Sequence, residues 1–154
     1  IIGSLAQIQT MRIVIINGPN LNLVGKREPE MYGSQSMDDY IESLIQRYAN
    51  QEVSYFQSNV EGELVNLIQQ HGFQSDGLII NAGAYAHTSI AIADAVKAVP
   101  AKVIEVHISN VFAREAYRHH SYLSAVCDGF IAGLGLFGYD LAIQSVIKKL
   151  NLPK

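Results

Sequence analysis

The sequence predicts an α/β fold built on one parallel sheet, and three observations predict it. Short β-branched and aliphatic runs alternate along the chain with segments of helical periodicity, which is typical of βαβ units. Five such runs fit into 154 residues, which suits one domain with the flavodoxin-like strand order 2-1-3-4-5 and helices on both faces. Charged residues make up 16% of the chain, against a usual share of about 25%. A low charge fits a sheet covered on both faces, or a surface buried against other subunits.

The first half of the chain predicts two strands and two helices. A β-branched run at 12–17 is ended by Gly18 and Pro19, and an irregular segment then continues to residue 36. Ser36 is a suitable N-cap for a helix over 37–50, where apolar residues recur at helical spacing. A second strand follows at 53–57, and a helix around 64–68 is closed by Gly72.

The second half of the chain predicts three strands and two helices. The run GLIIN predicts a third strand at 77–81, followed by a helix over 90–96 that stops before Pro100. The fourth and fifth strands are expected at 102–106 and 125–132, and the last helix at 139–150.

Residues 11–154 are expected to form a single catalytic domain, preceded by an N-terminal extension, 1–10. Met11 begins the strand-like MRIVIIN, which suits a natural start. The net charge is −3 without a basic stripe, so nucleic-acid binding is not expected. No apolar run reaches the ~18 residues of a membrane span. The single cysteine, Cys127, suits a reducing compartment, so the cytoplasm is the predicted location.

The predicted strand order also predicts where a ligand binds. In such sheets, ligands lie beyond the carboxyl ends of the strands, at the point where the order reverses. That point lies between strands one and three. The loops that reach it are 18–36, 82–88 and 107–122, and they hold most of the unusual polar residues in the chain. A long loop such as 18–36 is typical of an active-site lid.

Two pairs of residues suggest acid–base chemistry. Glu105 and His107 are two apart in a strand and point to the same face, where a carboxylate orients the ring and favours its protonated, acidic form. A structural ion pair is the competing interpretation. Arg27 and Tyr32 share the first loop, and a guanidinium near a phenol favours tyrosinate. An ordinary surface pair competes with that interpretation.

A nucleotide- or flavin-binding module of the same fold is the alternative function. Gly133, Gly135 and Gly138 match G-x-G-x-x-G between a strand and a helix. That fingerprint belongs to the first βα turn, however, and close strand–helix packing explains these glycines more simply. A non-catalytic assembly protein is a third possibility, suggested by the low charge. The histidines lack metal-ligand spacing, so no metal and no cofactor are expected.

Three long blocks of the sequence resemble type II 3-dehydroquinate dehydratases. They are NGPNLNLVGKREPEMYG (17–33), NAGAYAHTSIAIADA (81–95) and EVHISNVFAREAYRHHSYLS (105–124), and the segment GLGLFGYDLAI (133–143) is also similar to that family. The similarity runs from about Met11 to the C-terminus in the same order and spacing. One departure is Ala86, where the family commonly has threonine.

The resemblance implies a lyase of the shikimate pathway or of quinate breakdown, which dehydrates 3-dehydroquinate to 3-dehydroshikimate by anti elimination through an enolate. Tyr32 corresponds to the general base, and Arg27 to the residue that keeps this phenol ionised. His107 corresponds to the acid that protonates the departing hydroxyl, oriented by Glu105. Asn20 would help hold the enolate, through a water.

The resemblance also implies a set of substrate-binding residues and an assembly. Trimers would assemble into a dodecamer, which would account for the low surface charge. Asp94 would reach the substrate from a neighbouring subunit, and Arg114 would act in the lid and substrate region. The remaining substrate-binding residues implied are Asn81, His87, Arg118, the backbone of Ile108 and the side chain of Ser109.

Overall fold

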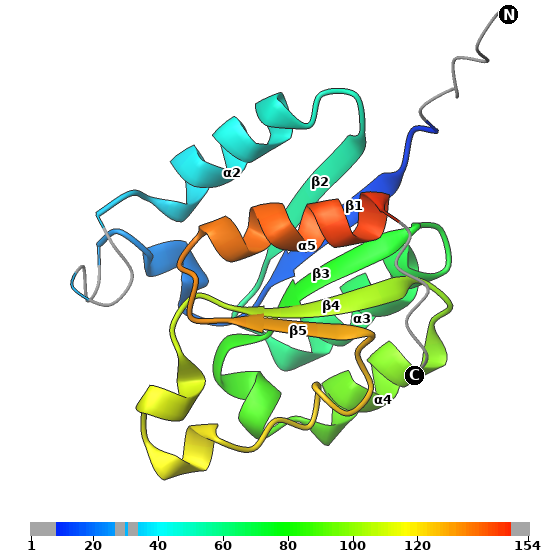
Figure 1. Cartoon of the computed structure of the whole chain (residues 1–154). Coiled ribbons are helices and arrows are strands. Elements are labelled where there is room, and N and C mark those ends of the chain that lie inside the picture. The colour runs from blue at the N-terminus through cyan, green and yellow to red at the C-terminus, as the bar shows by residue number, and fades with distance from the viewer. Residues whose placement is uncertain (1–8, 27–29, 31–33, 149–154) are drawn as a thin grey trace, which may run out of the picture.

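The computed structural model describes residues 9–26, 30 and 34–148. Within them, one five-stranded parallel sheet has the order β2-β1-β3-β4-β5, as Figure 1 shows. The strands are β1 (Arg12–Asn17), β2 (Glu52–Gln57), β3 (Gly77–Asn81), β4 (Lys102–His107) and β5 (Gly129–Ala132). The fold class and strand order predicted from the sequence are confirmed.

Helices cover both faces of this sheet. The helices α2 (Met37–Arg47) and α5 (Phe137–Ile147) pack on one face, and α3 (Glu61–Gly72) and α4 (Ile90–Ala98) pack on the other. Ser36 caps α2 as predicted, since its Oγ accepts a hydrogen bond from the Asp39 N–H at 3.1 Å. None of the helices in the described part of the chain is long and apolar enough to cross a membrane.

The position of β1 inside the sheet explains why residues 13–16 are all apolar. Ile13 and Ile15 face the core under α2 and α5, whereas Val14 and Ile16 face the core under α3 and α4. Successive side chains of a strand point to opposite faces, so a strand covered on both sides needs apolar residues at every position.

The structure corrects the limits of several predicted elements. The fifth strand begins at Gly129, not at residue 125, because the chain turns first: the N–H groups of Val126 and Cys127 both donate to the Leu123 carbonyl. Val126 and Cys127 pack partly buried against the core from this turn. The helix predicted over 37–50 ends at Arg47, and the last helix begins two residues earlier than predicted, at Phe137.

Candidate active site

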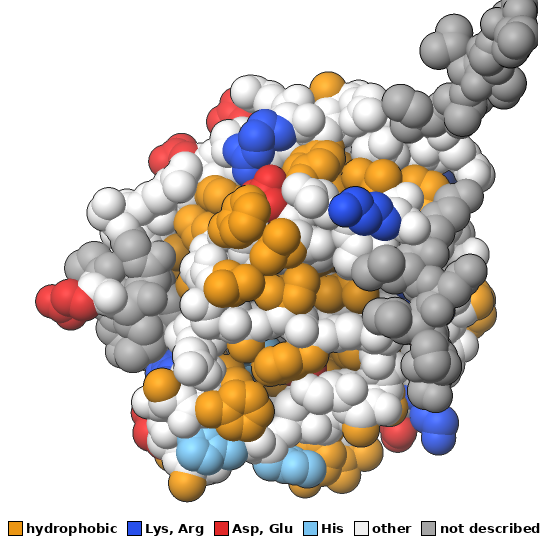
Figure 2. All heavy atoms as spheres, viewed as in Figure 1, with side chains coloured by type: hydrophobic (Ala, Val, Ile, Leu, Met, Phe, Trp, Pro, Cys, Tyr) orange, Lys and Arg blue, Asp and Glu red, His pale blue; other side chains and the backbone are white. Residues whose placement is uncertain are grey.

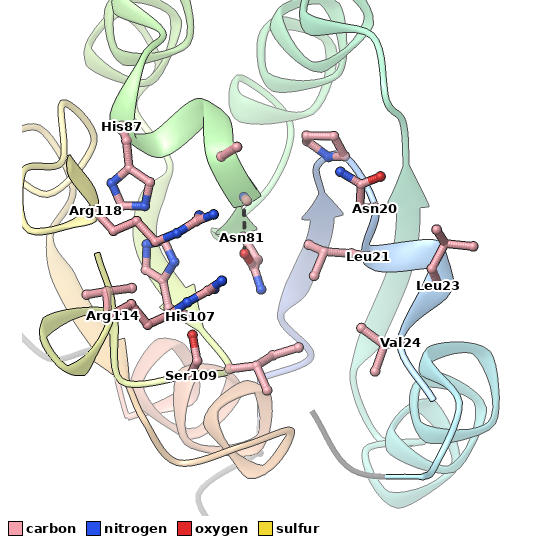
Figure 3. Close-up of a pocket in the computed structure, with 15 residues that line it drawn as sticks. Asn20, Leu21, Leu23, Val24, Asn81, His87, His107, Ser109, Arg114 and Arg118 are labelled. Carbon is pink, nitrogen blue, oxygen red and sulfur yellow. Dashed lines mark hydrogen bonds between the residues drawn. The ribbon is translucent and has the colours of Figure 1, made fainter. Parts of the chain in front are cut away.

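A pocket lies beyond the carboxyl ends of β1, β3 and β4, where the strand order reverses (Figure 3). Polar side chains from the ends of β3 and β4 and from the loops after them line one side, and Asn20 with apolar side chains after β1 lines the other. Its lining residues are Pro19, Asn20, Leu21, Leu23, Val24, Asn81, Gly83, Ala84, His87, His107, Ile108, Ser109, Val111, Arg114 and Arg118.

The turn after β1 is held close to the end of β3. The Gly18 N–H donates to the Asn81 carbonyl at 2.7 Å. A Cβ at Gly18 would come within 2.4 Å of the Ala82 carbonyl oxygen, so this approach requires glycine. Asn20 has φ +67°, a left-handed conformation that asparagine tolerates, and its N–H donates to Asn59 Oδ1 at 3.0 Å.

The amide of Asn81 is oriented by a buried hydrogen-bond chain. Its Oδ1 accepts from the Gly83 N–H at 3.2 Å, and its Nδ2 donates to the Tyr139 hydroxyl at 3.0 Å. Burial raises the pKa of Tyr139, so the phenol keeps its hydrogen and donates it to Asn17 Oδ1 at 2.8 Å. Since that single hydrogen is used, Asn81 must present its NH₂ group to the phenol.

The predicted pairing of Glu105 with His107 is present at the end of β4. Both side chains are buried, and His107 Nε2 lies 2.8 Å from Glu105 Oε1. Burial alone would raise the pKa of Glu105, but hydrogen bonds and charge from His107, with hydrogen bonds from Ser124 and Ser121, outweigh it and lower that pKa. An ionised carboxylate only accepts, so the Nε2–H of His107 donates and Nδ1 is the nitrogen that remains for the pocket.

His87 lies over His107 in a stacked arrangement. The ring centroids are 5.7 Å apart and the ring planes differ by 24°. His87 Nδ1 lies 2.7 Å from the His120 carbonyl oxygen, which can only accept, so Nδ1 carries the hydrogen. Burial, partly opposed by this hydrogen bond, lowers the pKa of His87, and the nearby His107 and Arg118 charges add to the lowering.

Two arginines give the pocket a positive character. The guanidinium ends of Arg114 and Arg118 point into the pocket in Figure 3, and their side chains are only 15% and 22% exposed. Glu115 is shared between them, with its Oε2 2.8 Å from Arg118 Nε and 3.6 Å from Arg114 Nε. Two cations with one shared carboxylate favour an anionic ligand.

The structure brings most of the predicted site residues together. Asp94 is an exception, because it is exposed on α4 and does not line the pocket. Arg27 and Tyr32 lie outside the described residues. Glu105 stands behind His107 rather than in the lining. The predicted residues that do line the pocket are Asn20, Asn81, His87, His107, Ile108, Ser109, Arg114 and Arg118.

The glycine run before α5 is used for turning and packing. Gly133 and Gly135 have φ +83° and +63°, in the left-handed region. A Cβ on Gly138 would lie 3.3 Å from a Val106 methyl and 3.4 Å from an Ile131 methyl, so α5 approaches the sheet closely there. This packing accounts for the glycines without a nucleotide. Over the described part of the chain, no group of three His, Cys, Asp or Glu side chains is arranged to hold a metal ion.

The family model described as "Dehydroquinase class II" matches residues 11–147. The chain belongs to the class II dehydroquinase family. It is 49% identical over 146 residues to a 3-dehydroquinate dehydratase of Idiomarina loihiensis, covering 93% of this chain and 96% of that one. It is 51% identical over 145 residues to a 3-dehydroquinate dehydratase of Psychromonas ingrahamii, covering 93% and 97%.

Crystal structures of other type II dehydroquinases share the fold of this dehydroquinase. That of Propionibacterium acnes has a TM-score of 0.86 and 42% identity, covering 91% of this chain and 99% of its own. That of Butyrivibrio crossotus also has a TM-score of 0.86, with 45% identity, covering 89% and 97%. The family predicted from the sequence is confirmed, and with it the prediction of an enzyme of the 3-dehydroquinate dehydratase class.

The sequence did not predict the residues that hydrogen-bond to the site residues of this dehydroquinase without lining the pocket. Ser121 and Ser124 contact Glu105, and Tyr139 orients Asn81. The serines lie directly after His119 and His120 in the same sequence block, but nothing in their spacing indicated that they contact β4. Tyr139 carried a clearer signal, because it is a tyrosine on the apolar side of a helix, where a buried hydroxyl needs a partner.

Proposed function

We propose that this chain dehydrates 3-dehydroquinate to 3-dehydroshikimate by an anti elimination through an enolate. The observation that carries the proposal is the buried Glu105–His107 pair at the wall of a pocket lined by two arginines. Relatives about half identical to this chain bear the name 3-dehydroquinate dehydratase, which supports the same substrate. The reaction then serves the shikimate route to aromatic amino acids or the breakdown of quinate.

The charge of the pocket suits this substrate. 3-Dehydroquinate carries a carboxylate, and the elimination passes through an enolate, so negative charge is present throughout the reaction. Arg114 and Arg118 supply the compensating positive charge. The backbone of Ile108 and the side chain of Ser109 bind the substrate carboxylate, while Asn81 and His87 bind its ring substituents.

Proton removal begins the reaction. A proton beside a ketone is weakly acidic, so its removal needs a positioned base and stabilisation of the enolate oxygen. Tyr32 is the proposed base, and Arg27 keeps its phenol ionised. Asn20 helps hold the enolate through a water, and its backbone, fixed by Asn59, supports this role.

Loss of the hydroxyl completes the reaction. His107 donates a proton from Nδ1 to the departing oxygen, because Nε2 is held by Glu105. The C–O bond breaks and its electron pair goes to the oxygen, which takes that proton and leaves as water. The electrons of the enolate form the new C=C bond, and the conjugated enone results. Glu105 stays ionised and stabilises the imidazolium before the transfer.

The assembly proposed is a dodecamer of trimers in which residues 11–154 form the catalytic domain. Exposed apolar side chains support a buried subunit surface: Figure 2 shows hydrophobic groups gathered on the face that carries α5 and β5, and Phe130, Leu134 and Phe137 are exposed there. Asp94, exposed on α4, reaches a neighbouring site. The single cysteine supports the cytoplasm as location.

The proposal is tested by adding 3-dehydroquinate to the purified protein and following the ultraviolet absorbance of the conjugated enone. Absorbance is expected to rise at the same rate with and without a chelator. Unchanged absorbance from folded protein would refute the function. Thermal stabilisation by NAD or FMN, together with no turnover, would favour the nucleotide-binding alternative.

A further inference from the structure

We propose that Ser121 and Ser124 are positioning residues, which aim the buried Glu105 carboxylate so that His107 delivers its proton from Nδ1. The inference rests on the proposed function, in which His107 is the acid. Both serines lie in the segment between η4 (Ala116–Arg118) and β5, and both contact Glu105 on β4. Glu105 has no exposed surface, so the hydrogen bonds it receives come from these neighbours instead of solvent.

The hydroxyl of Ser121 has only one hydrogen-bonding direction left. Its Oγ accepts from the N–H groups of Leu123 and Ser124, both at 3.1 Å. Its single hydrogen is therefore directed to Glu105 Oε1, 2.8 Å away. The backbone turn fixes the hydroxyl, and the hydroxyl fixes one carboxylate oxygen.

The two oxygens of Glu105 receive different partners. Oε1 accepts from His107 and Ser121, and Oε2 is hydrogen-bonded to Ser124. Because Oε1 already accepts two hydrogens, a proton on Glu105 would have to sit on Oε2, where it would displace the hydrogen given by Ser124. Three donors to one buried carboxylate favour its charged form, in agreement with its lowered pKa.

An ionised Glu105 sets the state of His107. The carboxylate accepts the Nε2–H and so holds the ring in this orientation, which leaves Nδ1 to exchange a proton with a bound molecule. If Glu105 were protonated easily, it would no longer accept the Nε2–H of His107 as a carboxylate, and it would no longer stabilise the imidazolium. The serines therefore act on the acid through the carboxylate and do not touch the substrate.

The other charged and titratable groups near this carboxylate come from two neighbouring segments. His87 from η2 (Gly83–His87) stacks on His107, and Arg118 lies on η4. With His119 and His120 they line a second hollow that also includes both serines. None of them is replaced in the variants below, so a change in the protonation of Glu105 or in the activity of His107 can be assigned to the lost serine hydroxyl.

The test compares Ser124→Ala, Ser121→Ala and Ser124→Thr, with Ser145→Ala as the matched control. The Ser145 hydroxyl is also partly buried, but it donates to the Ala142 carbonyl within α5, at 2.7 Å. Steady-state rates with 3-dehydroquinate are measured across pH. Separately, an infrared pH titration without substrate follows protonation of Glu105, with Glu105→Gln assigning its band.

Each alanine variant is expected to lower kcat about tenfold, the size of one lost hydrogen bond to a charged group, with little change in KM. The acid limb of its kcat profile and the protonation of Glu105 should both move to higher pH. Ser124→Thr should restore both, and Ser145→Ala should change neither. Ser121→Ala removes a hydrogen bond to Oε1 and Ser124→Ala removes one to Oε2, so the test can be made if either variant folds.

Alanine variants that lose thermal stability while Glu105 protonates at the wild-type pH would overturn the proposal and leave the serines a structural role. The infrared titration needs no turnover. A wild-type protein inactive on 3-dehydroquinate would therefore refute the proposed function separately, while the titration still decides whether the serines hold the carboxylate.

Discussion

At the scale of single residues, the chemistry of His107 is decided by what holds it. One ring nitrogen lies 2.8 Å from a Glu105 oxygen, and the ring contacts those of His87 and Phe130, with ring centroids 5.7 Å apart in each pair. The ring therefore has one orientation and one nitrogen for proton transfer. In the proposed mechanism, His107 acts in the bond-breaking step, which separates its role from that of groups that only bind substrate.

Replacing His107 with alanine should lower kcat by roughly 10²–10⁴, the usual contribution of a general acid, while KM changes little. The reason is that the acid acts on a charge that develops only as the hydroxyl leaves. Steady-state kinetics with 3-dehydroquinate measure both constants. An effect confined to KM would show that His107 binds substrate and does not act as the acid.

Tyr32→Phe should abolish turnover while the fold and the assembly stay intact, since this change removes only the hydroxyl that is proposed to act as the base. Activity, circular dichroism and size-exclusion chromatography measure the three properties. Tyr48→Phe is a matched control, because that phenol at the C-terminal end of α2 does not line the pocket; it donates to the Asp140 carbonyl and accepts from Gln144. Retention of most activity by Tyr32→Phe would refute the base assignment.

The sequence predicted the paired residues of the site but not their support. Glu105 and His107 were predictable because residues two apart in a strand face the same way, a purely local rule. Ser121 and Ser124 were not, since a turn of irregular structure carries them back to β4 and tertiary packing alone decides its path. The Asn20 N–H likewise donates to Asn59, a residue distant in sequence, a contact that local patterns do not predict.

At the scale of elements, caps and close approaches set the framework of the site. Ser89 Oγ accepts from the Ile92 N–H at 3.0 Å at the start of α4, directly after the loop that carries His87. The start of α4 was predicted correctly from its apolar spacing. The start of β5 was not, because Ala125–Cys127 is apolar enough for a strand yet reaches the core from a turn.

Ser89→Ala should lower the free energy of unfolding by about 1 kcal/mol, the usual value of an N-cap, and so lower Tm by roughly 2–4 °C in a domain of this size. The neighbouring Thr88→Ala is the control. Its hydroxyl is exposed and lies 3.5 Å from the Ala84 carbonyl, so its loss should have little effect. Equal losses of Tm in the two variants would show that the N-cap hydrogen bond of Ser89 does not stabilise the fold.

At the scale of the whole molecule, a sheet covered on both faces leaves its functional groups at one end. The low charge of the chain suits this arrangement, and buried titratable groups then couple stability to pH. Glu105 and His87 both have lowered pKa values in the folded protein. A lowered pKa means that the unfolded chain binds protons more readily, so both groups contribute stability that is lost on acidification.

Stability to urea should therefore fall as pH drops below about 6.5, the ordinary His pKa, and fall further below 4.5, the ordinary Glu pKa. His87→Asn should flatten the upper part of this dependence, and Glu105→Gln the lower part. Urea titrations at a fixed protein concentration over a pH series measure both slopes. An unchanged slope in Glu105→Gln would contradict a carboxylate that is held ionised by the fold.

Deuterium exchange into 3-dehydroquinate tests the central claim most directly, because it separates proton removal by the base from hydroxyl loss aided by Glu105-oriented His107. In D₂O, NMR follows exchange beside the ketone and formation of the enone in the same sample. His107→Ala is predicted to exchange the proton faster than it forms product, whereas Tyr32→Phe should do neither. If His107→Ala lost exchange and dehydration to the same extent, His107 would not be the acid of the elimination step.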